Sequence, residues 1–336
     1  MKTTLRFVPA ALAGLLLLTG CPGKKDTADT VAAEVAALPK TPAFNADSAY
    51  AFTAKQVAFG PRVPNTAAHV KTGDWIIGQF KKHGLTVQEQ PFEAKAFDGN
   101  ILKSRNIIAR FHPEAPRRVA VFAHWDTRPF ADKDAENKNA PLDGASDGAS
   151  GVAVALELAR VLAAQPDSLA PGVGVDFILF DSEDYGYDGV TQADKTNLLG
   201  SQDSWCLGSQ YWAKNVVPAN YKANFGILLD MVGAQGAKFS REGLSREKAP
   251  DVVEKVWNTA SQLGFSDFFL YADAPSIDDD HVYTNQAGVR TIDIIDFLPS
   301  GEFRPYHHTT QDNMSVIDRR TLKAVGQTVL TVIYGQ

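Results

Sequence analysis

The stretch VDFILFDSED, residues 175–184, joins an apolar strand to a cluster of carboxylates. Its first six residues are mostly β-branched or aromatic, which is typical of a strand that is covered on both faces. Asp181, Glu183 and Asp184 then place three carboxylates within four positions. Because ionised carboxylates beside a core are costly unless cations offset their charge, this stretch is either a solvated turn or part of a metal site.

The composition of the chain is that of an ordinary globular protein. Its 336 residues are 44% hydrophobic and 21% charged, which is enough for a large core in one α/β domain or two smaller ones. The formal net charge is -6 at pH 7, and Lys and Arg form no long run. We therefore expect neither nucleic acid nor another anionic surface as a partner.

The N-terminal part of the chain is predicted to lie outside the fold. Basic residues precede an apolar run at residues 7–18, which is too short to span a bilayer and ends just before Cys21. Residues 1–20 resemble a bacterial lipoprotein signal, which would leave Cys21 lipidated and the protein anchored on the periplasmic side of the cell envelope. An ordinary secretory signal is the alternative. Residues 21–43 are interpreted as a flexible tether, and Cys206 is left without a disulfide partner.

Residues 44–336 are predicted to form one domain in which strands alternate with helices. Strand patterns cover residues 87–92, 106–111, 119–123, 175–180, 225–229 and 291–295. Helical patterns cover residues 47–59, with Asp47 as the cap, and residues 67–83, 150–164, 207–215, 250–263 and 318–334. This order implies a mixed, mostly parallel sheet with helices on both faces. Residues 128–142 and 186–203 lack periodicity and are interpreted as functional loops.

Several polar residues follow the predicted strands at their carboxyl ends or precede a helix. They are His124, Asp126, Asp147, Glu183, Asp184, Asp230 and His308. Ligands of open α/β sheets bind outside this edge, so these residues are predicted to converge in one cleft. Imidazoles and carboxylates without a thiolate suit Zn²⁺, and an open coordination position would make the site catalytic. Of the neighbours Glu183 and Asp184, one can bind metal while the other moves protons.

The remaining histidines are interpreted more simply. His69, His83 and His112 fall on predicted helix or loop surfaces, so their side chains are expected to be solvated. His307 and His308 are adjacent in the sequence and must point in different directions. At most one of the two is therefore expected to reach a shared metal.

Six motifs follow one another along the predicted domain: HWD at residues 124–126, GASDGASG at 144–151, DSED at 181–184, LLDMVG at 228–233, DDDH at 278–281 and HTTQD at 308–312. This ordered set resembles the zinc aminopeptidase superfamily, and more closely its glutaminyl cyclase branch. The resemblance covers residues 44–336 and implies a three-layer α/β/α sandwich. It also implies that Asp147, Asp184 and His308 bind zinc and that Glu183 is the proton carrier.

The resemblance leaves two activities open. As a one-zinc cyclase, the chain would convert the N-terminal glutamine of peptides or proteins to pyroglutamate and release ammonia, with Glu183, Asp230 and Asp279 as catalytic residues. As a two-zinc aminopeptidase it would remove N-terminal residues, with His124 and Asp230 on the second metal and Asp147 bridging. A non-catalytic envelope binding protein is a third possibility, which the complete set of acid, base and ligands argues against. The enzyme is expected to be a monomer that meets a membrane only through its lipid.

A cyclase reaction involves no water, so its pocket is expected to be narrow and aromatic. Candidate lining residues are Trp125, Trp205, Trp212, Phe303 and His307, although at least half of the aromatic ones are expected to belong to the core. The animal cyclases have Trp where His307 stands and Glu where Asp184 stands. One wall of the pocket is therefore expected to be more polar, and Asp184 to be a shorter but acceptable zinc ligand.

Overall fold

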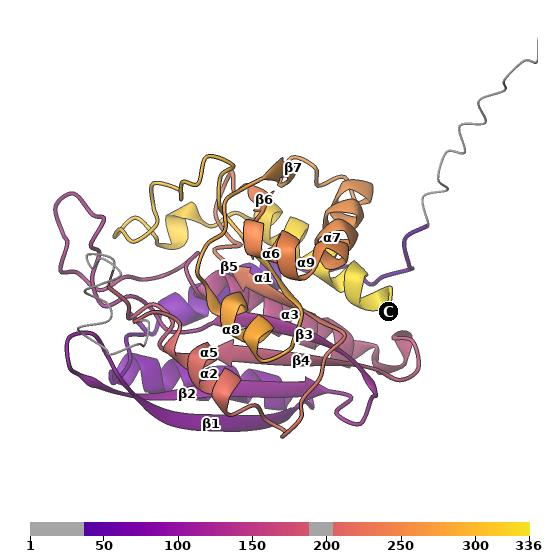
Figure 1. Ribbon diagram of the computed structural model, residues 1–336, viewed down its shortest axis with the longest axis horizontal. Helices are drawn as coiled ribbons and strands as arrows, with labels where there is room; N and C mark the ends of the chain where they lie inside the picture. Colours follow the sequence, from indigo (N-terminus) through magenta and orange to yellow (C-terminus); the bar gives the residue numbers. More distant parts are fainter. Residues whose placement is uncertain (1–36, 188–203) are drawn as a thin grey trace, which may run out of the picture. The chain divides into compact units, whose positions relative to one another are not determined.

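The computed structural model describes residues 37–187 and 204–336 (Figure 1). Leu38–Gln336 forms one compact unit, which begins slightly before the expected start at residue 44. The predicted signal at residues 1–20, Cys21 and most of the tether lie outside the described residues, as do residues 188–203 of the second loop. No helix in the described ranges is long and apolar enough to cross a membrane.

The central element is a six-stranded mixed sheet with the strand order β1-β2-β4-β3-β5-β8. Its strands are β1 (Thr86–Lys95), β2 (Ile101–Phe111), β3 (Arg117–His124), β4 (Val173–Phe180), β5 (Phe225–Asp230) and β8 (Thr291–Ile295). The pairs β1·β2 and β2·β4 are antiparallel, whereas β4·β3, β3·β5 and β5·β8 are parallel. Each predicted strand coincides with one of these, and the mixed, mostly parallel sheet is confirmed.

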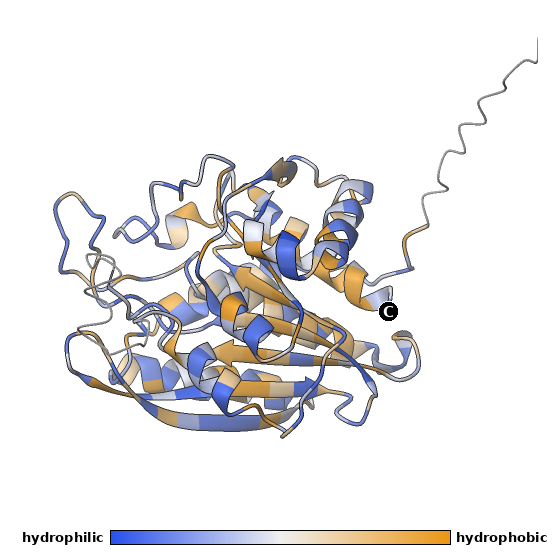
Figure 2. Cartoon of the chain, viewed as in Figure 1, coloured by the Kyte–Doolittle hydropathy of each residue, from blue (hydrophilic) through white to orange (hydrophobic). Residues whose placement is uncertain are grey.

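Helices cover both faces of this sheet and complete the predicted three-layer sandwich (Figure 1). The larger apolar cluster packs one face against α1 (Ala46–Val57), α2 (Ala67–Lys82), α3 (Ala149–Ala164), α7 (Pro250–Gln262) and α9 (Arg319–Tyr334). The opposite face packs against α5 (Leu207–Lys214), with α6 (Gly243–Lys248) and α8 (Asp280–Gln286) beside β8. Figure 2 shows that apolar residues dominate the central strands, while the edge strand β1 is largely hydrophilic.

Two details of the predicted elements are corrected by the structure. The side chain of Asn45, rather than Asp47, caps α1 by accepting hydrogen bonds from the backbone of residues 47 and 48. The short elements β6 (Phe239–Arg241), α6, β7 (Phe269–Asp273) and α8 were not predicted, and β6 and β7 form a separate two-stranded sheet. Elements of three to seven residues carry too little periodicity to be recognised in a sequence.

The glycine-rich turn before α3 lets this helix approach the sheet closely. Gly148 has a φ of +76°, and a Cβ at this position would lie 2.8 Å from Cε1 of His124. A Cβ at Gly151 would lie 2.2 Å from the carbonyl oxygen of Leu229. Neither backbone oxygen nor imidazole can yield that much space, so glycine is required at both positions. The turn therefore places Asp147 directly beside the ends of β3 and β5.

Candidate active site

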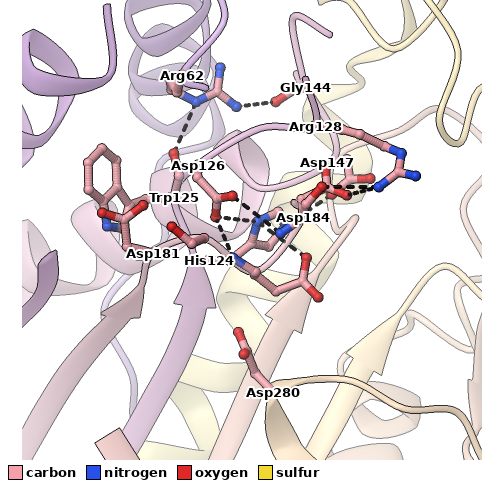
Figure 3. Close-up of polar contacts among 12 residues, drawn as sticks. Arg62, His124, Trp125, Asp126, Arg128, Gly144, Asp147, Asp181, Asp184 and Asp280 are labelled. Atoms are coloured by element: carbon pink, nitrogen blue, oxygen red, sulfur yellow. Dashed lines mark hydrogen bonds and ion pairs between the residues drawn. The ribbon is translucent and has the colours of Figure 1, made fainter. Parts of the chain in front are cut away.

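The predicted polar residues meet at the carboxyl edge of the parallel strands. Figure 3 shows four of them, His124, Asp126, Asp147 and Asp184. His124 ends β3, Asp230 ends β5, and Glu183 and Asp184 follow β4. A cavity of about 210 Å³ opens there. The predicted site residues that line it are Asp147, Glu183, Asp184, Trp205, Asp230, Asp279, Phe303, His307 and His308. The topology therefore brings together residues that are spread over nearly two hundred positions of the sequence. This is the convergence predicted from their places at the carboxyl ends of strands.

Asp147, Asp184 and His308 form a compact, buried group. Nε2 of His308 lies 3.4 Å from Oδ1 of Asp184 and 3.9 Å from Oδ2 of Asp147. The three side chains are buried, with exposed fractions of 4%, 2% and 5% in sequence order. Two buried carboxylates beside one imidazole are costly unless a cation balances their charge. Two oxygens and one nitrogen also form a donor set that suits zinc and leaves one coordination position open. These three residues can hold a zinc ion, and so can Asp147, His307 and His308, whose donor atoms lie within 4.8 Å of one another.

His307 also lies near Asp147, but its side chain has a different partner. Its Nδ1 is 3.1 Å from the ammonium nitrogen of Lys133. Burial and the charge of the neighbouring His308 hold the pKa of His307 well below its usual range. A neutral imidazole can accept a hydrogen bond from the Lys133 ammonium, and His307 is suited to be a wall of the cavity.

A second group of possible ligands surrounds His124 and shares Asp147 with the first. Nε2 of His124 lies 3.0 Å from Oδ1 of Asp147 and 3.2 Å from Oδ1 of Asp230. Burial alone would lower the pKa of His124, but the adjacent carboxylates of Asp126, Asp147 and Asp230 raise it well above its usual value. The carboxylates here can thus be balanced by a proton on His124. Donor atoms of His124, Asp147 and Asp230 also lie within 4.8 Å of one another, so the group can instead hold a metal ion.

The three predicted catalytic carboxyls have raised proton affinities. Burial, together with the charges of Asp279 and Asp184, raises the pKa of Glu183 well above its usual value, although His124 opposes the shift. Burial also raises the pKa of Asp279, and it raises that of Asp230 to about 8. Carboxyls whose pKa values are raised are suited to general acid and base chemistry.

Two further carboxylates hold the backbone that carries these groups. Asp126 accepts hydrogen bonds from the backbone N–H of Glu183 at 3.0 Å and of Asp184 at 3.2 Å. Asp312 accepts from the backbone N–H of Ser146 at 2.8 Å and of Asp147 at 3.0 Å. Both carboxylates are buried, so these bonds fix the orientation of the metal ligands from behind.

Two buried arginines were missed by the sequence analysis. Arg62 donates to the carbonyl oxygens of Trp125 at 3.1 Å and Gly144 at 2.7 Å, so it ties the end of β3 to the glycine-rich turn (Figure 3). Arg128 donates to the carbonyl oxygen of Asp184 at 3.1 Å, and its guanidinium lies 3.7 Å from the Asp184 carboxylate. Arg128 also pairs with the carboxylate of Asp132, four residues further along. No local pattern marks the bonds to the carbonyl oxygens, because these partners are far away in the sequence.

Backbone strain is concentrated around the site. Ser182, Cys206, Met231 and His308 have φ values of 56°, 57°, 48° and 57°. Residues with a Cβ rarely adopt this left-handed conformation, and such strain is retained where a function fixes the geometry. Each of these residues is a site residue or a direct neighbour of one.

Three of the five predicted pocket residues line the cavity. Trp205 stacks on the ring of His308 with centroids 5.7 Å apart, and Phe303 lies 4.1 Å from the ring of His307. The placement of Trp212 in the pocket is wrong, because Trp212 is fully buried on the opposite face of the sheet.

The placement of Trp125 in the pocket is also wrong. Its ring stacks on His69 with centroids 4.3 Å apart, and its Nε1 donates to the carbonyl oxygen of Arg105. His69 is not solvated as expected, because it is 2% exposed and its Nε2 lies 2.8 Å from Oδ1 of Asp181. These three side chains form a buried cluster.

Comparisons with known proteins are consistent with this geometry. The model of peptidase family M28 matches residues 106–333. Aminopeptidase YwaD of Bacillus subtilis (strain 168) is 29% identical over 286 residues, which make up 82% of this chain and 54% of that protein. The chain therefore spans about half the length of this relative.

Two solved structures are similar over nearly the whole chain. A Zn-dependent exopeptidase from Parabacteroides distasonis ATCC 8503 is 49% identical with a TM-score of 0.82. A glutaminyl cyclase from Bacteroides thetaiotaomicron, bound to N-acetylhistamine, is 47% identical with a TM-score of 0.81. Each match covers 88% of this chain and 100% of the other. The similar proteins thus include both peptidases and a cyclase.

Proposed function

The chain belongs to peptidase family M28, and on this premise we propose that it is a glutaminyl-peptide cyclotransferase. The observation that carries the proposal is that Asp230 and Asp279 line one small cavity together with Glu183. A cavity of about 210 Å³ suits a single amino-acid side chain, since it is smaller than the range of about 300–1,000 Å³ typical of drug-sized ligands. The similarity to a bacterial glutaminyl cyclase supports the same activity.

In this proposal Asp147, Asp184 and His308 hold a single Zn²⁺ ion. When bound, zinc supplies a positive charge that polarises the γ-carbonyl group of an N-terminal glutamine. The stack of Trp205 on His308 and the backbone hydrogen bonds to Asp126 keep the ligands in place. Trp205, Phe303 and His307 form the wall that keeps water from the reacting amide.

Glu183 is the proton carrier. It takes a proton from the α-amine while the amine nitrogen bonds to the γ-carbonyl carbon, and it returns the proton to the amide nitrogen that leaves as ammonia. One C–N bond forms and another breaks, so no water or oxidant is consumed. Asp230 and Asp279 form hydrogen bonds around the tetrahedral carbon. The pKa of Asp230 is raised to about 8, so its carboxyl can donate near neutral pH, and burial raises the pKa of Asp279 as well.

The runner-up is a two-zinc aminopeptidase. The observation that favours it is the second ligand group, in which atoms of His124, Asp147 and Asp230 lie within 4.8 Å of one another. In this case Glu183 would take a proton from water instead of from an amine. The two activities therefore share the proton carrier and differ in the role of His124 and Asp230.

The test is mass spectrometry of two peptides, one beginning with Gln and one with Leu, after incubation with the zinc-loaded full-length protein. Loss of one ammonia from the Gln peptide with the Leu peptide unchanged supports the cyclase. Stepwise removal of N-terminal residues from either peptide overturns it in favour of the aminopeptidase. Metal analysis provides a second criterion, because the cyclase requires one zinc ion per chain and the aminopeptidase requires two.

We also propose that the protein is lipidated on Cys21 and acts as a monomer on the periplasmic side of a bacterial envelope membrane. The proposal rests on the signal pattern at residues 1–20. Cys21→Ser should release the protein from the membrane fraction of cells that express the full chain. If the variant stays with the membranes as the wild type does, the lipid anchor is excluded.

A further inference from the structure

Cys206 is a buried thiol that lies against the proton carrier. Its Sγ donates a hydrogen bond to Oε1 of Glu183 at 3.2 Å. Within residues 37–187 and 204–336, this is the one hydrogen bond that the Glu183 carboxylate makes, and the nearest imidazole nitrogen, Nδ1 of His124, is 3.9 Å from Oε2. We propose that Cys206 is a positioning residue that orients the Glu183 carboxylate for proton transfer. The inference rests on the role of Glu183 in the proposed function.

The backbone at Cys206 is held in a conformation that a cysteine does not favour. Its φ of 57° and ψ of 35° are left-handed, where Gly or Asn would be less strained. Its N–H donates to the carbonyl oxygen of Glu183 at 2.9 Å, and the N–H of Leu207 donates to that of Ser182 at 3.1 Å. The strained turn thus joins the start of α5 to the acidic segment and aims the thiol at Glu183. Strained backbone of this kind is found where a function fixes the geometry, which supports a role for the thiol.

The neighbouring residue performs a similar task for the metal site. Trp205 stacks on the ring of His308, while Cys206 reaches Glu183. Two consecutive residues before α5 therefore position one zinc ligand and the proton carrier. Atoms of Glu183, Cys206 and Asp279 also lie within 4.8 Å of one another, so the thiol lies beside both carboxyls.

The chemistry of a thiol suits this position. Burial and the nearby carboxylates raise the pKa of Cys206 well above its usual value, so the sulfur keeps its proton and donates it. An S–H group is a weak donor. It can fix Oε1 of Glu183 without strongly stabilising the ionised carboxylate, which leaves Oε2 basic enough to take the proton of the substrate amine.

The kinetic test compares the full-length wild type with Cys206→Ala and Cys206→Ser on whichever peptide the wild type processes. Cys206→Ala should lower kcat about tenfold, equivalent to about 1.4 kcal/mol, with KM changed less than about twofold. Cys206→Ser keeps a donor and should recover kcat to within about threefold of the wild type. Cys206→Gly relieves the backbone strain but should be as slow as Cys206→Ala, and it serves if the alanine variant does not fold.

Thr328→Ala is the matched control, because it also removes a small buried polar side chain, in α9 and away from the cavity. It should lower the melting temperature and leave kcat unchanged. Zinc content should be equal in all variants. If Cys206→Ala keeps wild-type kcat, or if the serine and glycine variants are equally slow, Cys206 acts by packing alone or not at all, and the proposal is overturned.

A spectroscopic readout is independent of turnover. The sequence has two cysteines, so in a Cys21→Ser background the S–H stretching band reports Cys206 alone. The band should lie at lower frequency than in Glu183→Ala, where the acceptor is gone; the same frequency in both would overturn the proposal. Wild-type protein that processes neither peptide would instead refute the proposed enzyme function, which separates the two failures.

Discussion

Replacement of His69 by Leu should strongly destabilise the fold, although His69 lies outside the cavity. The change leaves the Asp181 carboxylate, which is 0% exposed, without the imidazole at 2.8 Å. Among the residues that the structure describes, one hydrogen bond to this carboxylate would remain, from the backbone N–H of Arg105 to Oδ2 at 2.7 Å. Removal of one partner from a buried pair costs about 3–5 kcal/mol because the other charge stays buried. For a domain of this size we expect a melting temperature lower by about 6–15 °C.

The assay is urea unfolding of four zinc-loaded proteins: wild type, His69→Leu, Asp181→Asn and the double variant. Asp181→Asn removes the charge but keeps an oxygen that can accept from Arg105. In the Asp181→Asn background, His69→Leu should lower the free energy of unfolding by only about 1–2 kcal/mol. The coupling energy between His69 and Asp181 is then about 2–3 kcal/mol. The same loss from His69→Leu in both backgrounds would refute the argument, because the imidazole would then act by packing alone.

The pH dependence provides an internal check. Burial raises the pKa of Asp181 and His69 opposes the rise, so the loss of His69 raises this pKa further. A carboxyl with a raised pKa in the folded state binds more protons when folded, so its contribution to stability is lost as pH increases. The deficit of His69→Leu should therefore shrink as the pH is lowered from about 8 to about 5. A deficit that grows toward low pH would contradict the charge argument.

Three further predictions concern the site itself. Glu183→Gln should lower kcat by a factor of about 10²–10⁴ with zinc content unchanged, as shown by peptide kinetics and metal analysis; loss of zinc would mean that Glu183 is a ligand. Trp205→Ala removes the ring that stacks on His308 and should weaken zinc binding about 10–100-fold in a chelator competition, whereas equal affinity would contradict an orienting role. Burial and the charge of Asp147 raise the pKa of Asp312 to about 7, so the zinc-free protein should lose stability as pH rises from about 4 through about 7. Asp312→Asn should flatten this dependence in melting curves, and an unchanged curve would exclude Asp312 as its source.

The strands and ligands could be predicted because they depend on local pattern and chain order. Apolar runs such as residues 175–180 identify buried strands, and polar residues directly after such strands must meet at one edge of the sheet. Asp147, Asp184 and His308 follow from this rule together with the resemblance. The short strands β6 and β7 could not be predicted in this way, because three and five residues are too few to show a periodic pattern of apolar side chains.

Long-range partners could not be predicted in this way. His69 falls on a helix pattern that suggests solvent, yet its partner Asp181 is 112 residues further along the chain. Arg62 and Arg128 form hydrogen bonds with backbone carbonyl oxygens. Every residue has a carbonyl group, so the sequence does not mark the ones that accept these bonds. The exclusion of Trp125 from the cavity, by contrast, could have been predicted from the sequence. In extended chain, alternate side chains point to opposite sides, so a site that uses His124 and Asp126 excludes the residue between them.

The two activities left open by the sequence differ in how one cluster of negative charge is balanced. Asp147 and Asp230 both lie within 3.2 Å of Nε2 of His124, and Asp126 lies 3.5 Å from its Nδ1. These carboxylates raise the pKa of His124, so a protonated imidazole can balance them in an enzyme with one zinc ion. In an enzyme with two, the second ion would displace that proton and take the same place. Residues that match the ligands of a two-metal peptidase are therefore compatible with a one-metal cyclase, because imidazolium and metal satisfy the same carboxylates.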